Sequence, residues 1–184
     1  MIEVELRAFV DSVTYNRLLG AFGIAKEHTR QVTYYLDTKV DTRIQVSTRG
    51  GRVWQKLGKM HADAREEYEL VLTQAEARTM RALFANLGFG VKVAWFRERS
   101  LFQLGDIVWT VDDTIGYGKI VEAELLVDES AVEGARIKLQ NAFAKLGIAI
   151  PEKVVFDEAY KQYLLTWETL TQGLDETWVE ALGA

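Results

Sequence analysis

Charged residues spaced two positions apart recur in four segments of the chain. Glu3, Glu5 and Arg7 alternate with apolar residues at its start, and the spacing returns in segments 65–69, 97–99 and 122–124. Side chains at i and i+2 of a strand lie on one face, roughly 7 Å apart. Each segment is therefore expected to be a strand with one charged face. Doubled carboxylates on such a face suit a divalent cation, and doubled arginines suit a phosphate chain.

A single strand of this kind is usually an ordinary amphipathic strand with one face in water. Four of them favour a site, because acids are doubled within strands and not paired with bases as in surface ion pairs. Capped amphipathic helices need an apolar sheet face to cover. If they cover the apolar side of a closed sheet, its charged side becomes a tunnel inside a barrel.

Composition narrows the chemistry of any metal site. The chain of 184 residues has no cysteine and only two histidines, which excludes thiolate zinc sites, disulfides and cysteine nucleophiles. A metal would then be held by carboxylates, which suits Mg²⁺ or Mn²⁺.

The net charge of −5 argues against a nucleic-acid partner. No apolar run reaches membrane-spanning length, so a cytoplasmic protein with no membrane partner is expected.

The pattern predicts an α+β fold of about eight mostly antiparallel strands and four or five helices. Strands are expected at 2–9, 31–36, 42–47, 53–57, 65–72, 91–104, 106–112 and 119–127. Helices are expected at about 12–22, 74–87, 131–146 and 156–170, followed by a short amphipathic piece. Segments 73–76 and 130–133 read as capping boxes, and segment 49–52 reads as a hairpin turn.

These residues resemble the CYTH proteins, also called triphosphate tunnel metalloenzymes. The N-terminal signature E-x-E-x-K/R is matched by Glu3, Glu5 and Arg7. Further motifs of the family are matched in order along the chain by segment 34–38, Arg43, Trp54 with Lys56 or Lys59, Arg65 with Glu67 and Glu69, Arg97 with Arg99, and Asp112 with Gly116, Gly118, Glu122 and Glu124. Each motif alone is weak, whereas the ordered set is specific.

The resemblance implies an eight-stranded antiparallel barrel, with helices outside, over residues 1–170 and a helical extension over 171–184. It implies a metal-dependent enzyme acting on a triphosphate-bearing small molecule. The implied metal ligands are Glu3, Glu5 and Glu124 first, then Glu67, Glu69, Asp112 and Glu122. The implied substrate-binding residues are Arg7, Arg43, Lys56 or Lys59, Arg65, Arg97 and Arg99. Catalytic roles fall to Glu5, Glu67 and Arg65.

Gln45 departs from the family pattern, because it stands where the motif L-R-[IL]-R has its second arginine. Three functions therefore stay open. The first is hydrolysis of inorganic triphosphate, a nucleoside triphosphate or thiamine triphosphate, and the second is cyclisation of ATP by a class IV adenylyl cyclase. The third is a polyphosphate-binding module with little turnover. Exposed apolar positions in the last helix would also allow a homodimer.

Overall fold

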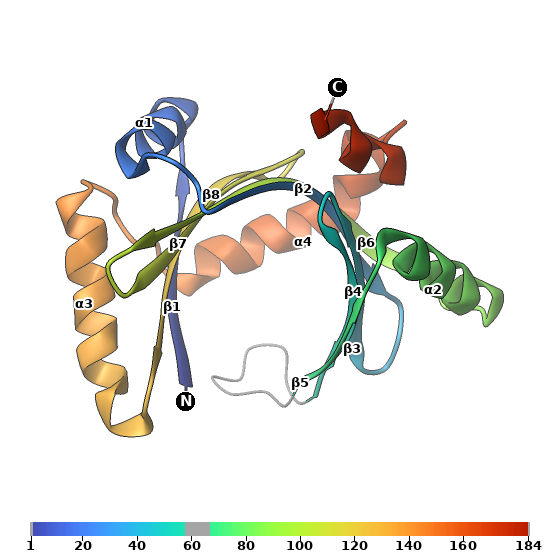
Figure 1. Ribbon diagram of the computed structural model, residues 1–184, viewed down its shortest axis with the longest axis horizontal. Helices are drawn as coiled ribbons and strands as arrows, with labels where there is room; N and C mark the ends of the chain where they lie inside the picture. Colours follow the sequence, from blue (N-terminus) through green and yellow to red (C-terminus); the bar gives the residue numbers. More distant parts are fainter. Residues whose placement is uncertain (1, 58–66, 184) are drawn as a thin grey trace. The chain divides into compact units, whose positions relative to one another are not determined.

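The computed structural model describes residues 2–57 and 67–183. Its strands form one antiparallel sheet of eight strands in the order β1-β8-β7-β6-β2-β3-β4-β5 (Figure 1). The predicted α+β class and strand number are confirmed. A closed barrel is not confirmed, because the sheet is not closed.

The chain divides into two compact units that share three elements. One unit comprises Met1–His28 with Glu98–Lys161, and the other comprises Thr29–Arg97 with Gln162–Ala184. The divisions fall inside strands β2 (Glu27–Leu36) and β6 (Val91–Leu104) and inside helix α4 (Lys153–Leu170).

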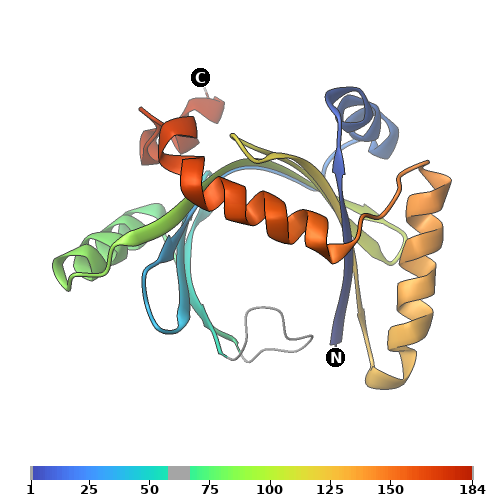
Figure 2. The same ribbon diagram turned by 180° about the vertical axis from the view of Figure 1, so that it is seen from behind.

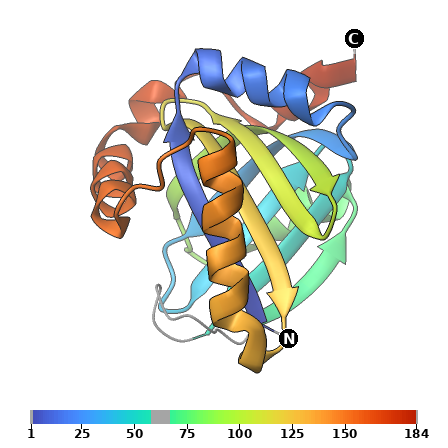
Figure 3. The same cartoon turned by 90° about the vertical axis from the view of Figure 1, so that its left-hand side faces the viewer.

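In the first unit, helices cover the apolar face of the sheet. Strand β8 (Gly118–Val127) pairs with β1 (Ile2–Val10) on one side and with β7 (Ile107–Thr114) on the other. Helices α1 (Ser12–Phe22) and α3 (Val132–Lys145) pack on these strands, and α3 runs alongside β1 and β8 (Figure 3). Their core contains Leu18, Trp109, Val121, Leu139 and Phe143.

In the second unit, strands β2, β3 (Asp41–Ser47), β4 (Gly50–Lys56) and β5 (Glu67–Leu72) follow one another as antiparallel neighbours. Helix α2 (Gln74–Asn86) packs on β3, β4 and β5. The 3-10 helix η2 (Glu176–Gly183) contacts β3 and follows the C-terminal part of α4 (Figure 2).

Helix starts follow local capping chemistry, with one correction. The Asp11 side chain accepts a hydrogen bond of 2.7 Å from the Thr14 amide at the start of α1, and Thr73 with Glu76 forms the expected capping box of α2. The expected capping box at 130–133 is wrong. The chain first makes a 3-10 turn, η1 (Glu129–Ala131), so Ala131 occupies the N-cap of α3 and makes no side-chain cap.

Strand bounds differ from expectation mainly at β2 and β4. Strand β2 begins four residues early, next to the hydrogen bond of 2.9 Å between the His28 Nδ1 and Ser100 Oγ atoms. Strand β4 begins at Gly50, so the expected turn at 49–52 is largely strand. This change places Arg52 on the sheet.

Among the described residues, no helix combines the length and the apolar character that crossing a membrane requires.

Candidate functional site

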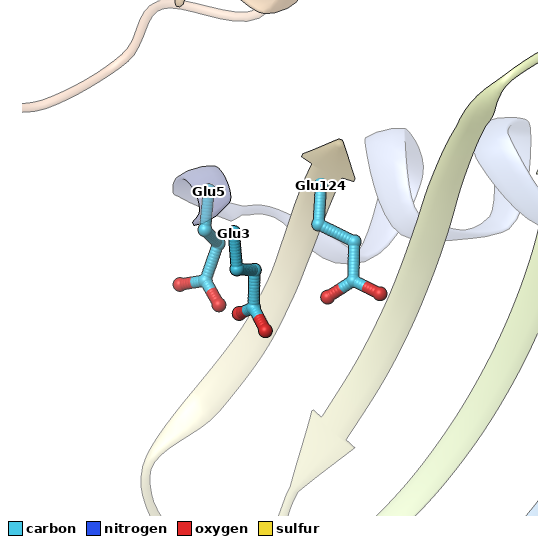
Figure 4. A group of neighbouring side chains, drawn as sticks. All are labelled: Glu3, Glu5 and Glu124. Carbon is cyan, nitrogen blue, oxygen red and sulfur yellow. The ribbon is translucent and has the colours of Figure 1, made fainter. Parts of the chain in front are cut away.

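Three carboxylates from two neighbouring strands come together in the first unit, on the sheet face opposite helices α1 and α3. Glu5 of β1 lies directly opposite Glu124 of β8, and Glu3 lies two residues before Glu5 on the same face. One carboxylate oxygen from each residue lies within 4.8 Å of the others (Figure 4). Three converging carboxylates fit a hard divalent cation such as Mg²⁺ or Mn²⁺. Their role as ligands stays a prediction.

The carboxylates of this cluster repel one another, and nearby arginines offset the repulsion only in part. Desolvation by the surrounding protein, followed by the charge of Glu122, raises the pKa of Glu5 to about 7, although the side chain is still reached by water. Arg7 opposes this shift. Desolvation and the charges of Glu3 and Glu122 also raise the pKa of Glu124. A bound cation would relieve this repulsion, because its charge would be the largest nearby.

Asp112, whose predicted role as a metal ligand stays a prediction, accepts hydrogen bonds from an arginine. Arg99 donates from Nε and Nη2 to the two Asp112 oxygens at 2.8 and 2.6 Å, and from Nη2 to Glu122 at 3.1 Å. Burial alone would lower the pKa of Arg99, but the charges of Asp112, Glu122 and Glu5 raise it above its usual value. Arg99 therefore brings a fixed positive charge to the acidic face.

Arg7 lies on the same face as the carboxylate cluster. It is directly opposite Glu122 in the β1–β8 pairing. Its guanidinium carbon lies 4.4 Å from the ring centroid of Phe156 in α4, and Phe9 stacks on the same ring. A phosphate could still reach the guanidinium edge, because stacking uses only its flat face.

The second unit presents a separate row of cations on one sheet face. Arg43 of β3 lies directly opposite Trp54 of β4, and Lys56 is two residues further along β4 on the same face. Arg43 donates to both Asp41 oxygens at 2.8 and 2.7 Å and lies over the Tyr35 ring at 4.1 Å. Of the two lysines left open by the sequence, Lys56 thus lies on the face that carries Arg43.

Glu69, also predicted as a metal ligand, pairs with Arg52, which the sequence pattern predicts to lie in a turn. Arg52 donates from Nη1 to a Glu69 oxygen at 3.0 Å. The signal for Arg52 was its spacing, because residues 52, 54 and 56 alternate as one face of a strand.

For four further predicted residues, no side-chain interaction enters the description of the site. Lys59 and Arg65 lie outside the described residues, Glu67 is placed only as the backbone partner of Lys56, and Arg97 lies two residues before Arg99 on β6.

The family model of the CYTH domain matches residues 1–155. The chain therefore belongs to the CYTH domain family, whose members are in general metal-dependent and related to triphosphate chemistry. No curated protein matches it.

Solved structures share the fold at low sequence identity. A protein from Pyrococcus horikoshii is 19% identical, with a TM-score of 0.67, covering 87% of this chain and 99% of its own. A conserved hypothetical protein from Pyrococcus furiosus is 20% identical, with a TM-score of 0.65, covering 80% and 91%. A protein from Vibrio parahaemolyticus titled "putative adenylate cyclase" is 18% identical, with a TM-score of 0.60, covering 81% and 90%.

Proposed function

We propose that this protein hydrolyses a triphosphate in a reaction that depends on a divalent cation. The observation that carries the proposal is the cluster of Glu3, Glu5 and Glu124. These acids repel one another, and they share a sheet face with Arg7 and Arg99. A site that combines doubled acids with arginines suits a magnesium or manganese complex of a phosphate chain.

In this proposal Glu3, Glu5 and Glu124 hold the cation. The bound ion would neutralise phosphate charge and lower the pKa of an attacking water. Glu5 has a pKa near neutrality without metal, so cation binding would release its proton. Arg7 and Arg99 would bind phosphate oxygens, because charge neutralisation and positioning supply most of the catalysis in phosphoryl transfer. The candidate substrates are inorganic triphosphate, nucleoside triphosphates and thiamine triphosphate.

Cyclisation of ATP is the second candidate, and it is motivated by the fold likeness to the Vibrio parahaemolyticus protein, which is described as a "putative adenylate cyclase". Its fold likeness alone does not carry the activity to this chain. The two reactions differ in their products. Hydrolysis yields a diphosphate and orthophosphate, whereas attack of the ribose 3′-hydroxyl on the α-phosphate yields cyclic AMP and pyrophosphate.

The test is product analysis with each triphosphate in the presence of Mg²⁺ or Mn²⁺, followed by ³¹P NMR and chromatography. Orthophosphate release supports hydrolysis, and cyclic AMP with pyrophosphate supports cyclisation. Binding without product would indicate a polyphosphate-binding module. The Glu5→Gln variant should lose cation-dependent turnover, while Glu133→Gln, an exposed change on α3, should keep it. Full activity of Glu5→Gln would remove the carboxylate cluster from the reaction.

A further inference from the structure

We propose that the second unit binds a triphosphate ligand and that Arg52 contacts one of its phosphate oxygens. Arg52 belongs to none of the family motifs that the chain matches. It is placed by the pairing of β3 and β4, in which Gln45 and Arg52 are direct partners and their side chains share one face. A cation on either strand at this pair would occupy nearly the same place. Because Gln45 is neutral, Arg52 supplies the positive charge there.

An aromatic ring and an amide fix the orientation of Arg52. Its guanidinium carbon lies 4.2 Å from the ring centroid of buried Trp54. Its Nε donates to the Gln45 side-chain oxygen at 3.2 Å, and the Gln45 amide in turn donates to Gln31 at 3.2 Å. A stacked and hydrogen-bonded guanidinium loses less rotamer freedom when it binds an anion.

The guanidinium of Arg52 has N–H groups and positive charge left over for another anion. Its one ion pair, among the residues that the structure describes, is with Glu69, and the two side chains are 39% and 34% exposed. Exposed pairs of this kind contribute little to stability. The Nη2 atom makes no hydrogen bond to any described residue. Two oxygens of a phosphate can therefore accept hydrogen bonds from the remaining N–H groups of the guanidinium.

A second guanidinium lies near the same ring. The Arg43 guanidinium carbon is 5.9 Å from the Trp54 ring centroid. Arg43 is already held by both oxygens of Asp41, whose side chain is only 8% exposed. The ion pair of Arg52 is more exposed than that of Arg43, so Arg52 can exchange its carboxylate partner for a phosphate more easily. We therefore expect Arg52 to contribute more to the binding free energy of a phosphate.

The test measures binding of inorganic triphosphate by calorimetry, with Mg²⁺ and at a temperature where turnover is slow. Arg52→Gln, which keeps a neutral polar side chain, should weaken binding about 10- to 100-fold. Arg49→Ala removes the same charge from the turn before β4, and its affinity should stay within about threefold of the unchanged protein. Gln45→Arg combined with Arg52→Gln should restore most of the affinity, because the cation returns to the same place.

The outcomes separate this inference from the proposed function. If the unchanged protein binds triphosphate and Arg52→Gln binds it equally well, the inference is overturned. It is also overturned if Arg52→Gln binds weakly and the double variant, with an unchanged melting temperature, does not recover. That result would mean that Arg52 only holds the strand in place. If the unchanged protein itself does not bind triphosphate, both the inference and the proposed function are overturned.

Discussion

At the scale of single residues, position on the sheet decides which charged groups can act together. Glu5 and Glu124 form a cross-strand pair of like charges, which is unfavourable without a compensating ion. Asp112 and Glu69 are also among the implied metal ligands, but each already forms an ion pair with an arginine. The carboxylate cluster is therefore the part of the acidic set that most needs a cation.

The raised pKa of Glu5 predicts how the stability of the metal-free protein depends on pH. The folded state holds this proton up to a pKa of about 7, whereas the ordinary value is 4.5. The contribution to stability is therefore full below pH 4.5 and is lost as the pH rises through 7. Without metal, the melting temperature should fall between pH 5 and 8, and Glu5→Gln should flatten this fall.

Calorimetric or fluorescence melting in EDTA measures this effect, with Glu133→Gln as the matched control. Added Mg²⁺ or Mn²⁺ at pH 8 should raise the melting temperature of the unchanged protein, because ligands that bind the folded state stabilise it. Glu5→Gln should respond much less. The same pH profile for Glu5→Gln and the unchanged protein would show that Glu5 titrates at an ordinary pKa.

At the scale of elements, the contact between β4 and α2 holds the strand that carries Arg52, Trp54 and Lys56. A Cβ atom at Gly51 would lie 2.4 Å from the Ala77 Cβ atom and 2.9 Å from the Gln45 carbonyl oxygen. Neither Ala77, which is fully buried in α2, nor the β3 backbone can move away easily. Glycine at this position lets the helix approach the sheet.

Two glycine-to-alanine changes should therefore act in opposite directions. Gly51→Ala should lower the free energy of unfolding by about 1–3 kcal/mol, because it overpacks the β4–α2 contact. Gly134→Ala lies in α3, where a Cβ meets nothing within 4 Å, and should raise it by about 0.5 kcal/mol. Urea denaturation measures both changes. A neutral Gly51→Ala variant would mean that α2 does not pack this closely on β4.

At the scale of the whole molecule, elements continue from one compact unit into the other. The chain passes between the units inside β2, β6 and α4, and not through linkers. When the part of such a strand or helix in one unit unfolds, its part in the other unit loses backbone hydrogen bonds as well. We therefore expect both units to unfold in one cooperative transition.

Core substitutions in each unit test this expectation. Leu139→Ala in α3 and Ile44→Ala in β3 each remove a fully buried side chain. Each should lower the free energy of unfolding by about 2–5 kcal/mol. Circular dichroism and tryptophan fluorescence should report the same shifted midpoint for each variant. Two separate transitions, each moved by only one of the variants, would show that the units unfold independently.

The sequence by itself determined most of the strands and helices, and it predicted the chemical class of the site. Alternation fixes which residues share a strand face, so Glu3 with Glu5 and Arg97 with Arg99 were readable from spacing alone. The caps at Asp11 and Thr73 were readable because they depend only on neighbours three residues away. The expected cap at 130–133 failed, since the backbone turned through a 3-10 segment first.

Only the tertiary structure decided which charged groups meet. Pairing of β1 with β8 brings Glu124 to Glu5 across more than a hundred residues, and no local pattern encodes that register. The structure also assigned Asp112 to Arg99 and Glu69 to Arg52, and it moved Arg52 from a turn onto the sheet. Partners between strands depend on long-range pairing, whereas the side-chain alternation within a strand is local. Residue types therefore predicted a site for a cation and a phosphate chain, while the fold decided which of the charged residues lie together.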